Sequence, residues 1–325
     1  MELIVNPHRR VLNVEPGANL LEQLRSHGVQ MSHSCRAGRC GTCRCKVVAG
    51  DVLDGSPEMQ RPLDRGPQIV LACQTFLTEP CTIEIPEADE IVVHPTRTVK
   101  ATVAAVESMT HDVKRLLLKV AKPVEYSPGQ HVHVQFVPGL VRPYSPAGLG
   151  ERNELEFFIR VGHDGRAGHH LANTLNAGDP VRVSGPLGTA YLRRKHRGPM
   201  RCVAGGTGLA PVLSIVRGAL AEGMRNPIHV YFGVRLPRDI FGLSWLQQVQ
   251  DRQQQLHVHV AVASAAPRNH RAGLVTDAIR ADLKDLRGWR AYLFGSPPLV
   301  ESTSLLLRRM RLPLEHIHAE AFYAQ

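Results

Sequence analysis

Short hydrophobic runs that alternate with polar residues dominate the first 86 residues. They predict strands over residues 1–6, 10–15, 44–50, 68–73 and 81–86. A different spacing occurs over residues 19–28, where Leu20, Leu21 and Leu24 fall on one face of a helix that ends at Gly28. The pattern predicts a small sheet with one short helix.

The rest of the chain shows two further patterns. Short strands separated by Gly/Pro turns indicate an antiparallel β-barrel, with strands predicted over 100–108, 113–120, 131–137, 154–161 and 180–186. Beyond these, strands alternate with helices, which indicates a parallel α/β sheet. Its strands are predicted over 201–205, 228–234, 256–263 and 290–295, and its helices over 210–223, 274–283 and 297–310. Residues 86–98 are polar, contain two prolines and are typical of a linker. We therefore expect a multidomain α+β and α/β protein with domains over residues 1–90, 97–196 and 197–325.

Four cysteines have the spacing C-x4-C-x2-C-x29-C: Cys35, Cys40, Cys43 and Cys73. This is the spacing of plant-type [2Fe–2S] proteins, in which four thiolates hold two irons. Gly38 and Gly41 would let backbone amides approach the sulfurs. Zinc is the alternative metal, although zinc sites usually pair two similar halves. Cys45, Cys81 and Cys202 are left over, and Cys45 and Cys202 lie in strand-like runs that predict core packing.

Composition and charge restrict the class of protein. The 325 residues are 43% hydrophobic and 21% charged, as in ordinary globular proteins, and no signal peptide or membrane-spanning run is visible. We expect a cytoplasmic protein that keeps its thiols reduced. The first 86 residues hold nine basic and nine acidic residues, whereas the remaining 239 hold 30 and 20. No nucleic-acid motif accompanies this basic excess. It predicts sites for bound phosphates and an acidic protein partner, partly at Arg193, Arg194, Lys195 and Arg197, or else a solvated basic surface.

Within the predicted barrel, the run "RPYS" carries Arg142, Tyr144 and Ser145. Arginine can clamp a phosphate, an aromatic face can cover a flavin ring, and a hydroxyl can meet a ring nitrogen. Downstream, Gly165 and Gly168 belong to a glycine-rich stretch before a predicted helix start, whose free N–H groups suit a diphosphate. The alternative for each glycine is an ordinary turn.

The α/β region holds a second glycine-rich turn between a strand and a helix. Gly205, Gly206 and Gly208 would let the turn pass close to a pyrophosphate, and Thr207 could contact a ribose or phosphate oxygen. The run is not the G-x-G-x-x-G fingerprint. Gly295 begins a similar turn after the last predicted strand, and ligands of open α/β sheets bind at such strand ends.

Taken in order, the cysteine loop, the "RPYS" run and "GGTGLAP" resemble the ferredoxin–NAD(P) reductase family, in its oxygenase-reductase branch. The stretches "CGTCRC", "PEADEIV", "GPLGTAYL" and "GGTGLAPVLSIVRGAL" resemble the reductases of naphthalene dioxygenase-type systems. The resemblance implies an N-terminal β-grasp ferredoxin domain and FAD held by Arg142, Tyr144 and Ser145. It also implies NAD(P)H held by Gly205, Gly206, Thr207, Gly208 and Gly295, and a C-terminal aromatic, Phe322 or else Tyr323, that shields the flavin.

The implied activity is an NAD(P)H-dependent reductase. A hydride passes to FAD, and single electrons pass through the [2Fe–2S] cluster to a separate Rieske-type ferredoxin that feeds an aromatic-ring-hydroxylating dioxygenase. We expect a monomer with no nucleic-acid or membrane partner. Direct electron delivery to an oxygenase is an alternative, and a non-catalytic iron–sulfur or zinc scaffold is an alternative of another class.

Two residues depart from the family pattern. Phe294 stands where a cysteine usually precedes the last glycine turn, and Gly168 stands where serine or threonine is usual. Ser145, Phe294 and Phe322 are the candidate catalytic residues. Arg235 and Arg238 could meet the 2′-phosphate of NADPH or could be solvated, and we expect NADH to be used with some tolerance of NADPH.

Overall fold

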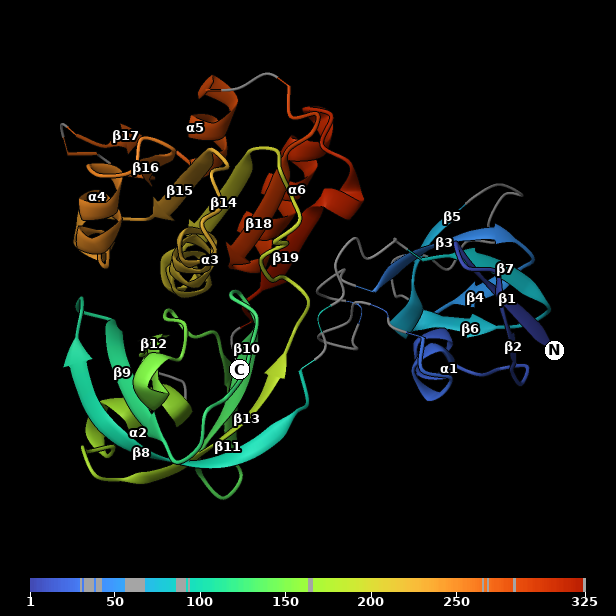
Figure 1. Ribbon diagram of the computed structural model, residues 1–325, viewed down its shortest axis with the longest axis horizontal. Coiled ribbons are helices and arrows are strands. Elements are labelled where there is room, and N and C mark those ends of the chain that lie inside the picture. The colour runs from blue at the N-terminus through green and yellow to red at the C-terminus, as the bar shows by residue number, and fades with distance from the viewer. Residues whose placement is uncertain are drawn as a thin grey trace. The chain divides into compact units, whose positions relative to one another are not determined.

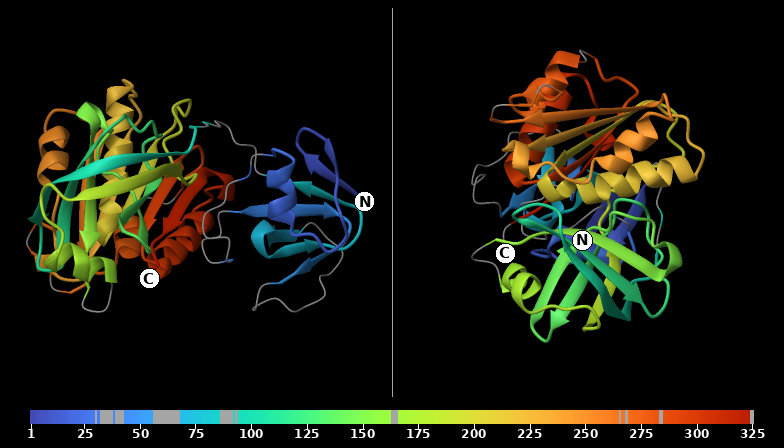
Figure 2. Two further views of the ribbon diagram at one scale, coloured as in Figure 1. Left: turned by 90° about the horizontal axis from the view of Figure 1, so that it is seen from below. Right: turned by 90° about the vertical axis from the view of Figure 1, so that its left-hand side faces the viewer.

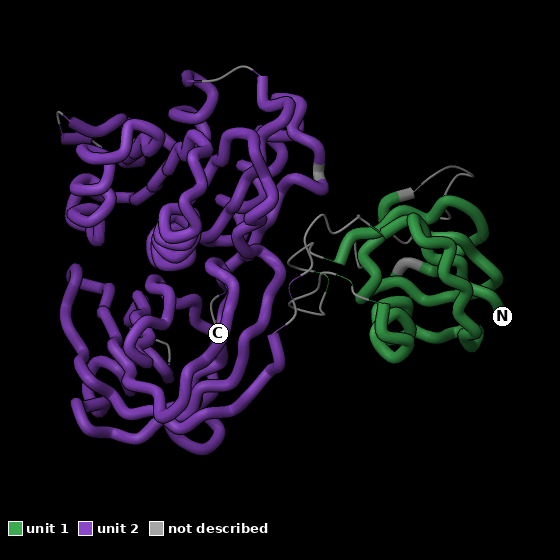
Figure 3. The backbone as a smooth tube through the Cα atoms, viewed as in Figure 1, with its two compact units in different colours: residues 1–89 green, residues 90–325 purple. Residues whose placement is uncertain are grey.

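The computed structural model describes residues 1–29, 31, 38, 43–55, 68–85, 92, 94–162, 166–264, 266–267, 269–282 and 285–323. The chain divides into two compact units, residues 1–89 and residues 90–325 (Figure 3).

In its described residues, the first unit is a mixed sheet with one α-helix. The sheet order is β2-β1-β7-β3-β5, and β1 and β7 run parallel. The strands are β1 (Glu2–Asn6), β2 (Arg10–Asn13), β3 (Arg44–Ala49), β5 (Gln68–Leu71) and β7 (Cys81–Glu84), with β4 (Val52–Asp54) and β6 (Thr75–Leu77) as a separate pair. Helix α1 (Leu20–Ser26) buries the predicted leucine face in the core of this unit, and Asn19 caps its N-terminus. Cys45 is buried in the same core, as predicted.

The second unit begins with a six-stranded antiparallel sheet in the order β11-β10-β13-β8-β9-β12. Its strands are β8 (Arg97–Ser108), β9 (Val113–Val120), β10 (His131–Val137), β11 (Leu140–Tyr144), β12 (Glu154–Arg160) and β13 (Pro180–Leu187). The sheet curls around its own hydrophobic core, and helix α2 (Arg166–Asn173) packs against that core. In the described part of the chain no ladder joins the outer strands β11 and β12, so the predicted barrel is an open half-barrel.

A six-stranded parallel sheet completes the second unit, in the order β17-β16-β15-β14-β18-β19. Its strands are β14 (Met200–Gly205), β15 (Ile228–Val234), β16 (Leu256–Val262), β17 (Arg271–Ala272), β18 (Arg290–Gly295) and β19 (Ile317–Ala321). The helices are α3 (Leu209–Ala221), α4 (Ser244–Gln250), α5 (Val275–Asp282) and α6 (Pro297–Arg309). Helices α3 and α4 cover one face of the sheet, and α5 and α6 cover the other (Figures 1 and 2).

Helix α3 joins the two halves of the second unit. Its buried residues share one hydrophobic core with Ala147, Phe158 and Ala190 of the half-barrel region, and the helix lies between the parallel sheet and the half-barrel in Figure 1. No helix of the described residues is long and apolar enough to span a membrane. The predicted boundaries near residues 90, 97 and 196 stay predictions.

Candidate functional site

Two of the four predicted cluster ligands lie in the described residues. Cys43 directly precedes β3, and Cys73 lies in a 3₁₀ turn over Ala72–Gln74. Both are buried, and the Ala72 N–H donates to the Cys43 carbonyl oxygen at 2.8 Å. Cys35 and Cys40 lie outside the described residues.

Donor groups surround the two described sulfurs. The Gly38 N–H donates to Cys73 Sγ at 3.3 Å, the Cys73 N–H donates to Cys43 Sγ at 3.5 Å, and Gln74 Nε2 donates to Cys73 Sγ at 3.8 Å. Gly38 has a φ of +73°, which favours glycine, and a Cβ there would lie 2.9 Å from Gln74 Cγ. N–H donors aimed at sulfur stabilise thiolates, so this arrangement fits an iron–sulfur cluster.

The "RPYS" residues end strand β11. The Tyr144 ring packs edge-on against Phe136 and near Phe157, and burial raises the pKa of Tyr144 to about 12. Ser145 is buried, and its Oγ has no hydrogen-bond partner among the described residues. Arg142 is half-buried and donates to the Val141 carbonyl oxygen at 2.8 Å. A buried hydroxyl without a partner beside an aromatic ring and a guanidinium fits a bound flavin.

The diphosphate turn is described only in part, because Gly165 lies outside the described residues. Gly168 lies inside α2 and is buried. A Cβ at Gly168 would lie 3.2 Å from Gly162 N and from Val161 Cα. The departure from the usual serine or threonine therefore coincides with a close approach of helix and loop backbone.

The two nucleotide turns meet at the carboxyl ends of adjacent parallel strands, β14 and β18. A Cβ at Gly295 would lie 3.1 Å from Gly205 N, and one at Gly208 would overlap the Phe294 carbonyl oxygen. Gly206 has a φ of +54°. Thr207 lies between Gly206 and Gly208 in the 3₁₀ turn that precedes α3. The crowding explains why glycines occupy this turn, and the positive end of the helix dipole that follows it fits a pyrophosphate.

The C-terminal segment reaches the Gly295 turn. The Phe322 N–H donates to the Gly295 carbonyl oxygen at 2.7 Å, and the Phe322 ring packs against the core that α3 shares with the half-barrel. Phe294 belongs to that core and is completely buried. Arg235 and Arg238 are exposed beyond the end of β15.

The comparisons with known proteins agree with this geometry. Three families match: "2Fe-2S iron-sulfur cluster binding domain" over residues 3–78, "Oxidoreductase FAD-binding domain" over 100–191 and "Oxidoreductase NAD-binding domain" over 202–304. The reductase component of the naphthalene 1,2-dioxygenase/salicylate 5-hydroxylase systems of Ralstonia sp. is 56% identical over 324 residues, with 99% of each chain covered. The Pseudomonas putida reductase component of the naphthalene 1,2-dioxygenase system is 51% identical, again with 99% of each covered. An Amycolatopsis cytochrome P450 reductase of known crystal structure is 33% identical in sequence. Its structure superposes on this one with a TM-score of 0.74, and the match covers 99% of this chain and 98% of that chain.

The chain belongs to the ferredoxin–NAD(P)⁺ reductase family. The reductase therefore has the fold class and the three cofactor-binding domains that its sequence predicted: [2Fe–2S], FAD and NAD(P)H. The predicted enzyme class, an iron–sulfur flavoprotein reductase that transfers electrons from NAD(P)H, is confirmed by its relatives. The roles predicted for individual residues stay predictions.

The reductase contains a candidate nucleotide residue that the sequence did not indicate. The Arg160 guanidinium, at the end of β12, would lie 3.2 Å from a Cβ at Gly206, and Arg160 Nε is 3.2 Å from Asp112 Oδ2. A cation thus lies beside the glycine turn. Arg160 occurs in an ordinary strand-like run, and only the fold brings it to a turn far along the chain.

A buried ion pair also joins the half-barrel to the parallel sheet. His131 Nδ1 in β10 lies 2.9 Å from Glu320 Oε1 in β19. Burial lowers the pKa of His131, but the Glu320 carboxylate outweighs burial and raises the pKa above its usual value. Glu320 pairs with Phe294 across the two parallel strands. The pair therefore ties the C-terminal strand to the half-barrel beside the candidate site.

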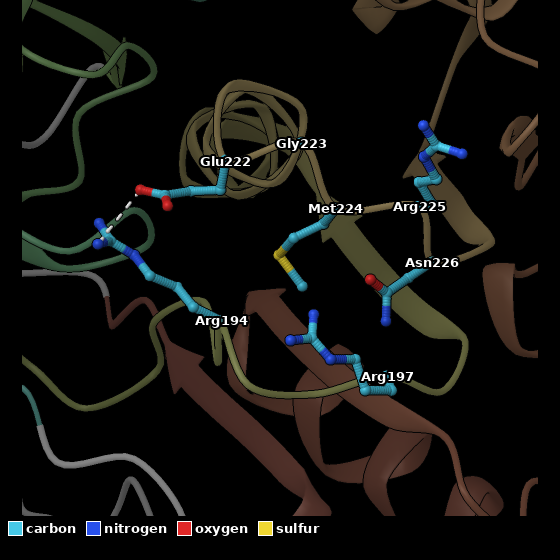
Figure 4. A pocket seen from close by; sticks show the side chains of 7 residues that line it. All are labelled: Arg194, Arg197, Glu222, Gly223, Met224, Arg225 and Asn226. Carbon is cyan, nitrogen blue, oxygen red and sulfur yellow. Dashed lines mark ion pairs between the residues drawn. The ribbon is translucent and has the colours of Figure 1, made fainter.

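The predicted basic surface needs one correction. The Arg193 side chain is buried: it donates to the Tyr191 and Thr189 carbonyl oxygens and lies over the Tyr191 ring. It therefore contributes to packing and not to a docking face. Arg194 and Arg197 are exposed and line a pocket of about 520 Å³ at the C-terminal end of α3, where Arg194 pairs with Glu222 at 3.2 Å (Figure 4). This pocket lies at the opposite end of α3 from the glycine turn.

Proposed function

We propose that this reductase oxidises NAD(P)H, with NADH preferred, and passes electrons singly to a separate Rieske-type ferredoxin that serves an aromatic-ring-hydroxylating dioxygenase. When bound, FAD accepts the electron pair of the nicotinamide, and the [2Fe–2S] cluster carries one electron at a time. The names of the two most similar relatives described above support the partner class. We also propose that the protein is a cytoplasmic monomer with domains over residues 1–90, 97–196 and 197–325.

The cluster would be held by Cys35, Cys40, Cys43 and Cys73. The N–H donors directed at the two described sulfurs support this assignment, because they offset thiolate charge in a buried place. Zinc could bind the same four thiolates, but it is not redox-active, so N–H donors would have no reduction potential to adjust.

FAD would be held by Arg142, Tyr144 and Ser145, with Gly165 and Gly168 at its diphosphate. Arg142 can offer charge-assisted donors to a phosphate, and Tyr144 presents a ring held by Phe136 and Phe157. The Ser145 hydroxyl would find in the flavin the hydrogen-bond partner that the described part of the chain does not supply.

NAD(P)H would lie across Gly205, Gly206, Thr207, Gly208 and Gly295, with Arg160 and Arg235 toward its phosphates and Phe294 and Phe322 toward its nicotinamide. The observation that carries the proposal is the meeting of both glycine turns, Arg160 and Phe322 at one edge of the parallel sheet. This edge faces the half-barrel that holds the "RPYS" strand, because Glu320 contacts His131 there.

Anaerobic titration with NADH tests the proposal. We expect flavin and iron–sulfur absorption bands in the purified protein and bleaching of both by NADH. The kcat/KM for NADH should exceed that for NADPH. A colourless protein, or one whose bands do not respond to either nucleotide, would contradict the function.

Arg142→Ala tests the flavin assignment separately. The variant should lose FAD during purification, because a charge-assisted hydrogen bond worth about 1.5–3 kcal/mol disappears. Excess FAD should restore part of the activity. A full flavin complement with unchanged affinity would remove Arg142 from the site.

A further inference from the structure

Helix α3 connects both halves of the candidate site. Its N-terminus follows the glycine turn at Gly206–Gly208, and its second and third turns carry Ser214 and Arg217. Ser214 is completely buried, and about a quarter of the Arg217 side chain is exposed.

Both side chains bind the backbone that directly follows Ser145. Ser214 Oγ donates to the Gly148 carbonyl oxygen at 2.8 Å, and Arg217 Nη1 donates to the Ala147 carbonyl oxygen at 2.9 Å. The Tyr126 hydroxyl donates to the same Gly148 carbonyl at 3.0 Å from the half-barrel side. Two consecutive carbonyls are thus fixed by α3.

The Arg217 guanidinium is itself held in place. It lies 4.8 Å from the centre of the Trp245 ring, and Nη1 is 3.1 Å from Glu156 Oε2. The backbone of Glu156 in turn accepts the Ala147 N–H at 2.8 Å. The segment 147–148 is therefore bonded on one side to the half-barrel strand β12 and on the other side to α3.

We propose that Ser214 and Arg217 are positioning residues for electron transfer from the nucleotide. They form a polar clasp, defined here as Ser214 and Arg217 with the Ala147 and Gly148 carbonyls. The clasp fixes the flavin-facing Ser145 relative to the glycine turn at the other end of the same helix. Reactions between two bound groups depend steeply on their separation, so loosening the clasp slows the reaction without removing either binding site. This inference rests on the proposed function.

The chain offers a matched control. Arg115 also pairs with Glu156, with Nε 2.6 Å from Oε1, and its exposure is similar to that of Arg217. Arg115 also pairs with Glu107, which belongs to β8 of the half-barrel. Arg115→Met therefore removes a Glu156 ion pair but leaves the clasp intact.

The test compares Arg217→Met, Ser214→Ala, Arg217→Lys and Arg115→Met by stopped-flow bleaching of bound flavin over a range of NADH concentrations. Arg217→Met should lower the limiting rate about 10-fold or more, with NADH affinity and flavin content nearly unchanged. Arg217→Lys should restore part of the rate, and Ser214→Ala should show a smaller fall. Arg115→Met should lower the melting temperature while the limiting rate stays at the wild-type value. Equal falls in rate for Arg217→Met and Arg115→Met, or no fall in either, would overturn the proposal.

Hydrogen exchange of the flavin-free protein gives a readout that does not depend on activity. The Ala147 amide should exchange faster in Arg217→Met than in Arg115→Met, because only the former frees the carbonyl side of the segment. Equal exchange in the two variants would argue against a clasp. A wild-type flavin that NADH does not bleach would instead contradict the proposed function, and the exchange comparison would still decide on the clasp.

Discussion

Phe294 shows what a single residue at the edge of the site contributes. Its ring is completely buried in the core that α3 shares with the half-barrel, whereas the cysteine usual at this position is much smaller. Phe294→Cys would leave a cavity, and we expect a loss of roughly 2–4 kcal/mol in the free energy of unfolding. Urea denaturation of both proteins would measure it. If stability is unchanged, the ring does not pack as tightly as its burial indicates.

The same substitution also tests the predicted role in hydride transfer. Phe294 directly precedes the Gly295 turn, and its bulk beneath that turn would hold a bound nicotinamide away from the flavin, so the limiting bleaching rate of Phe294→Cys should equal or exceed that of the wild type. A large fall in that rate, with the variant folded and flavin-loaded, would make Phe294 itself a positioning element.

Single residues divide into those that sequence could assign and those that it could not. The candidate roles of the cysteines and of the "GGTG" glycines were predictable, because they follow from the local spacing of these residues. Arg160 gains its place beside Gly206 only through the fold, and Arg193 lies in a basic run yet is buried. A run of charges predicts a surface only on average, and one member of it can turn inward onto a ring such as Tyr191.

At the scale of elements, one face of strands β15 and β16 carries a group of neighbouring histidines. His229, His257 and His259 lie beside one another on this face, with ring centroids of His229 and His257 4.6 Å apart. The fully buried Arg201 on β14 lies within cation–π distance of Tyr231 and Trp289. Asp282 lies near His259 and accepts from Tyr231 and Arg271. Burial, and then the neighbouring His257, Arg201 and His259, lower the pKa of His229 to about 4.

This lowered pKa predicts acid sensitivity. The unfolded chain takes up a proton at His229 near its ordinary pKa of 6.5, whereas the folded chain resists until about pH 4. Stability should therefore fall as pH decreases from about 6.5 to 4. His229→Gln should weaken this fall, and the same substitution at exposed His111 serves as the control. Melting temperatures over pH 4–7 would show it, and identical pH profiles for both variants would contradict the mechanism.

Helices and strands were predictable where a regular hydrophobic spacing continues over enough residues. The leucine face of α1 and most strands of the two sheets in the second unit follow from residue spacing. The short strands β4, β6, β11, β17 and β19 did not, because short runs become strands only when a partner strand lies beside them. The half-barrel stayed open for a related reason: closure depends on the distance between β11 and β12, which no local pattern encodes.

At the scale of the whole molecule, charge is divided unevenly between the two units. Residues 1–89 hold nine basic and 11 acidic residues, and residues 90–325 hold 30 and 18. An acidic acceptor protein would be steered toward the basic unit, so its reduction rate should fall steeply with salt. The variant Arg194→Glu/Arg197→Glu should flatten that dependence, since both side chains are exposed. Arg193 is left unchanged because it is buried. If the rate of acceptor reduction does not depend on salt, the basic residues form a solvated surface and do not steer the partner.

The separation into two compact units predicts that cluster loss should spare the second unit. Cys43→Ser should lose iron because a proposed ligand is gone, while the half-barrel and the parallel sheet keep their own cores. Cys45→Ala is the matched control: Cys45 lies two residues away on β3 and is equally buried, but it does not belong to the proposed ligand set.

Reduction of a two-electron dye by NADH should persist in Cys43→Ser, and reduction of a one-electron ferredoxin should collapse, because only the second reaction needs the cluster. Both reactions should persist in Cys45→Ala. Full iron content and unchanged ferredoxin reduction in Cys43→Ser would show that the ligand set is wrong. Loss of dye reduction together with ferredoxin reduction would show that the two units do not fold independently.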